Sequence, residues 1–191
     1  MSEPLGWSSA GYSTWAERLL EQLDEWLFWS WPRLESLDDE EFLWEPVEGC
    51  WSVRPGPDRG FVLDGERQSS DGSPVTTIAW RLCHIGGGVL ANRNAKLFGA
   101  PVWDEATARY PGTAQETLAW VREELGRWQS GVRGLSDRRL TQPVGPAGRS
   151  DADRSVAWLV MHIHREVIHH GAEICLLRDL FSTRQGSRNA T

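Results

Sequence analysis

Four stretches of the chain repeat apolar residues every three or four positions, and this pattern constrains the fold more than any other feature. The stretches cover residues 15–34, 76–98, 114–135 and 155–181. Such spacing places the apolar side chains on one face of an α-helix, and almost no segment shows the alternation typical of a strand. Four helices of this length, each with one apolar face, predict an all-α protein built as a four-helix bundle.

Proline and capping residues mark the predicted helix ends. Pro32 is expected to end or bend the first helix, because its ring removes a backbone donor. Ser73–Pro74 resembles the entry to the second helix, with a capping serine before a first-turn proline. Thr113 and Glu116 have the spacing of a capping box ahead of the third. The fourth is expected to end at residue 181, which leaves a polar tail over residues 182–191.

The connection between the first two helices is long and rich in glycine and proline, and it covers about residues 36–72. A connection of this length is typical of a lid or binding loop, or of a crossover that spans the bundle. The sequence leaves both interpretations open. A chain of 191 residues is otherwise expected to form one domain, here residues 1–181 followed by the tail.

The charge balance and the cysteines exclude several classes of protein. The net charge is −7 with a pI of about 5.3, which is the wrong sign for a general nucleic-acid binder. No apolar run approaches the roughly 20 residues that span a bilayer, and Met1–Pro4 does not resemble a signal peptide. The three cysteines lack CxxC spacing, which excludes a disulfide framework and a four-cysteine zinc site. We therefore expect a cytoplasmic protein with neither nucleic-acid nor membrane partners.

Four of the five histidines lie within residues 161–173. Glu166 and His170 are four residues apart, so they face the same way on a helix. His170 falls inside the apolar stripe and Glu166 at its edge. A carboxylate and an imidazole in a bundle core are costly to desolvate, and a divalent cation would compensate for this cost. His169 is turned by about 100° from His170, so its pair with Glu173 is expected in solvent.

A third ligand has to come from another helix, and His84 is the one histidine outside this segment. His84, Glu166 and His170 would form a site with two histidines and one carboxylate, with at least one position open for water or substrate. The alternative is that these histidines are hydrogen-bonded core or surface residues without a metal. His162 continues the ridge formed by Glu166 and His170, so it is an alternative ligand or a hydrogen-bonding neighbour of one.

Three segments resemble the DinB-like superfamily of metal-binding four-helix bundles. They are residues 45–54 (EPVEGCWSVR), 77–85 (TIAWRLCHI) and 165–181 (REVIHHGAEICLLRDLF). They follow one another in the family's order, and the resemblance extends over nearly all of residues 10–181. The second and third segments are the specific ones, and the first is a looser match.

This resemblance implies a function as well as a fold. Family members have a histidine in the second helix and a His-x-x-x-His or Glu-x-x-x-His pair in a later one, and these positions fall on His84, Glu166 and His170. The glutamate variant resembles mycothiol-dependent isomerases such as maleylpyruvate isomerase, and relatives include S-transferases that use bacillithiol or mycothiol. The resemblance thus implies a bound zinc or nickel ion, a low-molecular-weight thiol as cosubstrate, and a tendency to form dimers.

Two other classes of function remain open at this stage. One is a non-catalytic stress or sensor protein that binds a metal or a small molecule in the same bundle. The other is an interaction bundle without any metal. Thiol-dependent turnover distinguishes the first from an enzyme, and metal content identifies the second.

Residues near the expected pocket are harder to interpret. Trp51 either closes over the pocket or plugs the end of the bundle. Arg54 and Arg81 could pair with a carboxylate on the thiol or the electrophile, although solvated side chains are the favoured interpretation. No catalytic side chain separate from the metal site is predicted, and Cys50, Cys83 and Cys175 are interpreted as packing residues. The tryptophan-rich stretch at residues 26–31 has apolar side chains on more than one face, which suggests the interface of a homodimer.

Overall fold

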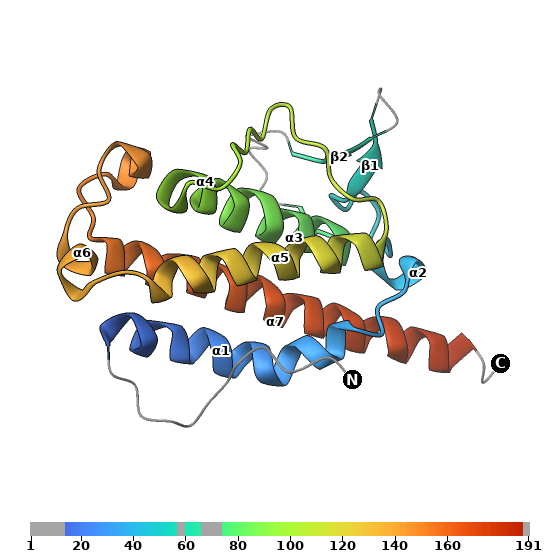
Figure 1. Cartoon of the computed structure of the whole chain (residues 1–191). Helices are drawn as coiled ribbons and strands as arrows, with labels where there is room; N and C mark the ends of the chain where they lie inside the picture. The colour runs from blue at the N-terminus through green and yellow to red at the C-terminus, as the bar shows by residue number, and fades with distance from the viewer. Residues whose placement is uncertain (1–13, 57–59, 66–73, 189–191) are drawn as a thin grey trace.

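Four long helical segments lie side by side in the structure, which is a computed structural model and describes residues 14–56, 60–65 and 74–188 (Figure 1). Three segments are single α-helices: α1 (Trp15–Leu34), α5 (Ala114–Arg133) and α7 (Val156–Arg188). The fourth is a composite of three elements joined end to end: α3 (Ile78–His84), the π-helix η1 (Ile85–Ala91) and α4 (Asn92–Phe98). Both α1 and the composite segment pack on α5 and on α7. The predicted all-α four-helix bundle is therefore confirmed.

The core lies between these helices and is filled by the apolar faces that the spacing predicted. Each fully buried leucine or isoleucine contributes roughly 2 kcal/mol relative to an exposed one. The largest fully buried side chains on the four segments include Leu20, Leu23, Leu27, Ile78, Leu82, Leu125, Trp128, Leu159, Ile163 and Ile174.

The π-helix η1 contains three consecutive glycines, Gly86 to Gly88. A Cβ atom added to Gly86 would lie 2.6 Å from the Trp120 ring, and one added to Gly87 would lie 2.6 Å from the Trp103 ring. Glycine at these two positions therefore lets two indole rings pack directly against the helix backbone. π-Helical turns are short and often occur at functional sites, and this one begins directly after His84.

Two helix ends differ from the sequence-based expectations, whereas α1 spans residues 15–34 as predicted, with Pro32 in its last turn. The second helical segment begins at Ile78, and Thr77 provides the cap by accepting a hydrogen bond from the Trp80 amide at 3.2 Å. The start predicted from Ser73 was therefore wrong, and Ser73 itself lies outside the described residues. α7 extends to Arg188, so most of the predicted tail is helical.

The long connection between α1 and α3 contains regular structure. It includes the short helix α2 (Asp39–Phe42) and an antiparallel pair of strands, β1 (Val53–Pro55) and β2 (Phe61–Leu63). Trp51 also forms a parallel bridge with Thr76, which keeps the chain extended up to the Thr77 cap. The connection between α5 and α7 likewise contains α6 (Asp137–Thr141) and a 3₁₀-helix, η2 (Pro146–Asp151).

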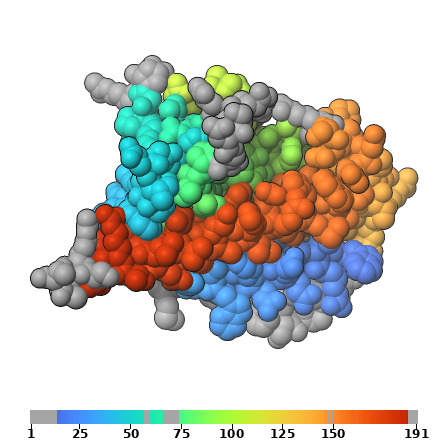
Figure 2. Space-filling view, turned by 180° about the vertical axis from the view of Figure 1, so that it is seen from behind, coloured from blue at the N-terminus to red at the C-terminus, as the bar shows by residue number. Residues whose placement is uncertain are grey.

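The tryptophan-rich stretch of α1 is mostly packed within the bundle. Trp31 is buried, and Trp26 lies so close to Gly171 that an added Cβ would come within 2.0 Å of its ring. Trp29 is 70% exposed. Dimerisation through this stretch stays a prediction. Seen from the opposite side, α7 crosses the surface beside α1, and its C-terminal end extends past the bundle (Figure 2). None of the described helices is long and apolar enough to cross a membrane.

Candidate metal centre

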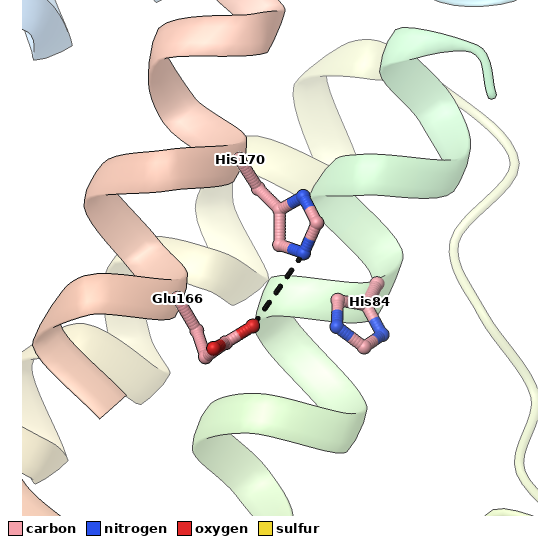
Figure 3. Close-up of side chains that lie close together, drawn as sticks. All are labelled: His84, Glu166 and His170. Atoms are coloured by element: carbon pink, nitrogen blue, oxygen red, sulfur yellow. Dashed lines mark ion pairs between the residues drawn. The ribbon is translucent and has the colours of Figure 1, made fainter. Parts of the chain in front are cut away.

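Helices α3 and α7 bring together the three side chains predicted to bind a metal. His84 is the last residue of α3, and Glu166 and His170 lie one turn apart on α7 (Figure 3). The potential ligand atoms of the three residues all lie within 4.8 Å of one another. Nε2 of His170 is 3.8 Å from Oε2 of Glu166, and the two imidazole rings are nearly perpendicular with centroids 5.0 Å apart. Two separate helices thus converge on one small region.

Neighbouring groups on α3 and η1 hold the ring of His84 in place. The indole of Trp80 stacks on it, with centroids 5.0 Å apart and an angle of 11° between the planes. Trp80 is itself fixed, because its Nε1 donates a hydrogen bond to the backbone oxygen of Asp64 at 2.7 Å. Gly88 lies next to this ring, since a Cβ atom added there would be in van der Waals contact with Nδ1 of His84 at 3.5 Å.

The orientation of His170 is set by a carboxylate on the next turn of α7. Nδ1 of His170 lies 2.8 Å from Oε2 of Glu173, and Glu173 is in turn ion-paired with Arg81 of α3. The guanidinium is farther from Nδ1, at 3.5 Å. Because a carboxylate only accepts hydrogen bonds, Nδ1 carries the ring proton. The lone pair is then on Nε2, which is the nitrogen close to Glu166. A metal-binding histidine is commonly oriented by such a carboxylate.

Burial keeps both histidines of the cluster neutral at pH 7. It lowers the pKa of His84. Burial, together with the positive charges of protonated His84, protonated His169 and Arg81, lowers the pKa of His170 to about 4. Neutral imidazole is the form that binds a metal. Together with a carboxylate, these nitrogen and oxygen donors fit a divalent cation such as zinc or nickel, with coordination positions left open.

A second cluster shares His170 but does not suit a cation. It consists of His169, His170 and Glu173. The side chain of His169 is 61% exposed, and the carboxylate of Glu173 is already paired with Arg81. A metal ion there would lie beside the guanidinium of Arg81, which is only 13% exposed and would repel it. By contrast, the Arg165 that pairs with Glu166 is 65% exposed and is free to turn into solvent. The cluster of His84, Glu166 and His170 is therefore the better candidate.

His162 lies beside this cluster without joining it. Its Nδ1 is 3.7 Å from Oε1 of Glu166, and its ring stacks on Trp158 with centroids 5.3 Å apart. Arg165 contacts both His162 and Glu166. This arrangement places His162 next to Glu166, and its role as an alternative ligand stays a prediction.

The remaining predicted pocket residues have contrasting surroundings. Trp51 lines an open cavity of about 900 Å³ that His84 also lines. Arg54 is paired with Glu45 at 2.6 Å and with Asp64 at 3.0 Å. The side chain of Arg81 is 13% exposed. Both arginines thus bind carboxylates of the protein itself. Arg54 is nevertheless 44% exposed to solvent, whereas Arg81 is largely buried, and a role of either in ligand binding stays a prediction.

The three cysteines do not provide an activated thiolate. Cys50 and Cys83 are almost fully buried, and burial raises the pKa of Cys83 to about 12. Burial also raises the pKa of Cys175. A thiol with a raised pKa is a poor nucleophile at neutral pH. This agrees with their interpretation as packing residues.

Sequence reasoning missed two partners of the site. Glu173 was expected to be solvated beside His169, but it contacts His170 and Arg81. Its position three residues after His170 was the available signal, because residues three apart also share a helix face. The other partner is Trp80, which lies four residues before His84 and shares its helix face, but the stacking of the two rings could not be read from this spacing.

Replacing Glu173 with glutamine should weaken zinc binding about 10- to 100-fold, because His170 would lose the anionic acceptor that orients its ring. The measurement is a competition titration with a chromophoric zinc chelator. Asp179→Asn is the matched control, because Asp179 is an exposed carboxylate of the same helix that pairs with Arg33 instead. Equal zinc affinity in the Glu173 variant and the wild type would show that Glu173 does not orient the ligand.

Comparison with known proteins agrees with the fold. The model of the DinB superfamily matches residues 30–174, a range that includes His84, Glu166 and His170. No curated protein and no solved structure matches the chain significantly. Since the family match covers most of the sequence and the helices form the expected bundle, the chain belongs to the DinB superfamily.

Proposed function

We propose that the protein is a metal-dependent enzyme that activates a low-molecular-weight thiol, of the mycothiol type, for S-transfer or thiol-dependent isomerisation. The observation that supports this most strongly is the cluster of His84, Glu166 and His170, one member of which borders a cavity of about 900 Å³. Three ligands beside an open space are typical of a catalytic metal. A purely structural zinc site would normally have four protein ligands.

The residues of the candidate metal centre and their neighbours have separate roles in this proposal. His84, Glu166 and His170 would hold the ion, with zinc as the proposed metal and nickel as the alternative. When bound, a divalent cation stabilises a thiolate relative to the thiol and so supplies a nucleophile at neutral pH. Glu173 keeps Nε2 of His170 available, and Trp80 supports the ring of His84. With buried cysteines, the nucleophile is proposed to come from the cosubstrate.

The test is a turnover assay on zinc-loaded, chelator-treated and reloaded protein. Mycothiol, bacillithiol and glutathione are offered with 1-chloro-2,4-dinitrobenzene for S-transfer, and with maleylpyruvate for isomerisation. We expect turnover that requires both a thiol and the metal, and that returns when zinc or nickel is restored. Glu166→Ala, which removes the anionic ligand, should be inactive under all conditions.

Other outcomes identify other functions. Stoichiometric metal without turnover for any thiol would favour a non-catalytic metal- or small-molecule-binding protein. Turnover that survives complete removal of the metal would contradict the proposed mechanism.

A further inference from the structure

The cavity beside His84 has walls that are unusually aromatic. Trp51 and Trp80 line it together with His84, and Trp103 and Tyr110 also line it from the connection between α4 and α5. A volume of about 900 Å³ is large enough for a small organic molecule. The chemistry of these walls therefore indicates which molecule would fit.

The first aromatic pair, Trp51 and Trp80, lies directly beside the candidate metal centre. The rings of Trp51 and Trp80 have centroids 6.0 Å apart, and Trp80 stacks on His84. The bridge to Thr76 holds the backbone of Trp51, and the hydrogen bond from Nε1 of Trp80 to Asp64 fixes the indole beside which the Trp51 ring lies. An apolar group in the cavity would therefore meet a preformed aromatic surface next to the proposed site of reaction.

The second aromatic pair is held by the backbone of the π-helix. Trp103 and Tyr110 have ring centroids 5.6 Å apart, and Trp103 packs against Gly87 and stacks on Trp120 at 5.3 Å. The amide of Tyr110 donates a hydrogen bond to the backbone oxygen of Phe61 at 3.0 Å, which ties this segment to β2. These contacts make the second pair as well anchored as the first.

The indole nitrogen of Trp103 gives an independent indication of a ligand. Nε1 is buried, and no acceptor for it is found among the residues that the structure describes. Buried donors in native proteins almost always have a partner. Nε1 itself has almost no exposed surface, so an acceptor oxygen on a bound molecule would satisfy it only when the ring of Trp103 turns toward the cavity that it lines.

The charged residues around the cavity do not favour a ligand of either charge. Asp64 is already paired with Arg54. The other charged residues that line the cavity are two acids and two bases, Asp104, Glu105, Lys96 and Arg109. With these charges balanced, the aromatic surface is the distinctive feature of the cavity.

We propose that this cavity binds the aromatic group of the electrophilic substrate, and of the thioether formed from it, with an acceptor oxygen near Trp103. Stacking on indole rings favours a planar aromatic group over an aliphatic one of similar polarity. The inference rests on the proposed function, because it assigns the cavity to the partner of the thiol. It narrows the substrate class to aromatic electrophiles that carry groups such as nitro or carbonyl.

The test uses unreactive thioethers, so that binding is measured without turnover. S-benzyl-, S-(4-nitrobenzyl)- and S-methyl-N-acetylcysteine are titrated into the zinc-loaded protein and followed by calorimetry. The wild type should bind the benzyl compound about tenfold more tightly than the methyl compound. The nitro compound should bind more tightly still.

Substitutions of residues that line the cavity test whether the thioethers bind there. Trp103→Ala should remove the preference for the benzyl compound, and Trp103→Phe should keep this preference but lose the gain from the nitro group. Ala106→Trp fills the cavity from an exposed lining position and should block all aromatic binding without disturbing the core. Trp29→Ala is the control, because it removes an exposed tryptophan of α1 that does not line the cavity.

The outcomes separate this inference from the proposed function. Equal affinity of the wild type for the benzyl and methyl compounds would overturn the inference, even if thiol turnover is found. An aromatic preference that survives in Ala106→Trp would also overturn it, because binding would then lie elsewhere. A preference lost in both cavity variants supports the inference, and it does so even if the thiol assays find no turnover.

Discussion

Replacing His170 with alanine should strip the protein of its metal while the bundle remains folded. We expect about one zinc or nickel ion per wild-type chain and an affinity more than about 100-fold lower in the variant, a larger loss than for an outer-sphere partner. The reason is that the site has three candidate ligands, so the loss of His170 would leave only Glu166 on the same helix and His84 on α3. The measurement is plasma mass spectrometry on protein purified without a histidine tag.

His169→Ala is the matched control for this experiment. It removes the neighbouring imidazole, which belongs to the cluster that Arg81 makes unsuitable for a cation. This variant should retain its metal. Because His170 belongs to both clusters, loss of metal from His169→Ala as well as from His170→Ala would place the ion in the second cluster instead. Wild-type protein without metal after incubation with zinc would favour an interaction bundle.

Folding stability should fall steeply between pH 6.5 and pH 4, and His164, a histidine with no part in the metal cluster, should account for a large share of this fall. His164 is 1% exposed, and its Nε2 accepts a hydrogen bond from Nε1 of Trp128 at 3.0 Å. Burial lowers its pKa to about 4, and a hydrogen bond with the backbone of Leu19 offsets this only in part. The unfolded chain takes up a proton below its ordinary pKa of 6.5, whereas the folded chain does not until about pH 4.

The contribution of His164 to the free energy of unfolding is therefore complete above pH 6.5, and it is lost as the pH falls towards 4. This shift in the pKa of His164 corresponds to a loss of roughly 3 kcal/mol in the free energy of unfolding over the whole range. About 2 kcal/mol of this is lost between pH 7 and pH 5. Urea unfolding in the presence of a chelator should show this loss. His164→Gln is the comparison, because it cannot be protonated and its side-chain oxygen can still accept from Trp128. Parallel pH profiles for the two proteins would refute the assignment.

The parts of the site that were predicted from sequence depend on geometry within a single helix. Glu166 and His170 are four residues apart, so one turn of α7 places them together whatever the rest of the fold does. His84 was assigned partly by elimination and partly by family resemblance. The structure places it close enough to the pair to share a metal. The bundle itself followed from apolar faces that have to be buried against one another.

The parts that were missed depend on contacts between helices. Arg81 and Glu173 are far apart in the chain, and their pairing requires α3 and α7 to be antiparallel at a particular register. The position of the Thr77 cap likewise depends on the bridge between Trp51 and Thr76. Local propensity favoured Ser73–Pro74, but a tertiary contact determines where the helix starts.

The cavity also depends on contacts between distant parts of the chain, so it could not be predicted from sequence. Trp103 is an ordinary loop residue in sequence, and its place beside the π-helix depends on the absence of a side chain at Gly87. Twelve tryptophans are conspicuous in the composition, yet composition does not distinguish those of the core from those of a ligand cavity. Which tryptophans belong to the core and which to the cavity can be told only from the packing of the helices.

The π-helix also changes how positions along this helix must be counted. The amide of Asn92 bonds to the carbonyl of Gly87, five residues back, so this turn contains an extra residue compared with an α-helix. An extra residue shifts the angular phase of everything that follows by about 100°. A related bundle with an uninterrupted α-helix here would reach the face occupied by Asn92 one position earlier. Alignments of this chain with such relatives should therefore place a single-residue gap between His84 and Asn92, since without it the cavity residues of the two proteins would be mismatched.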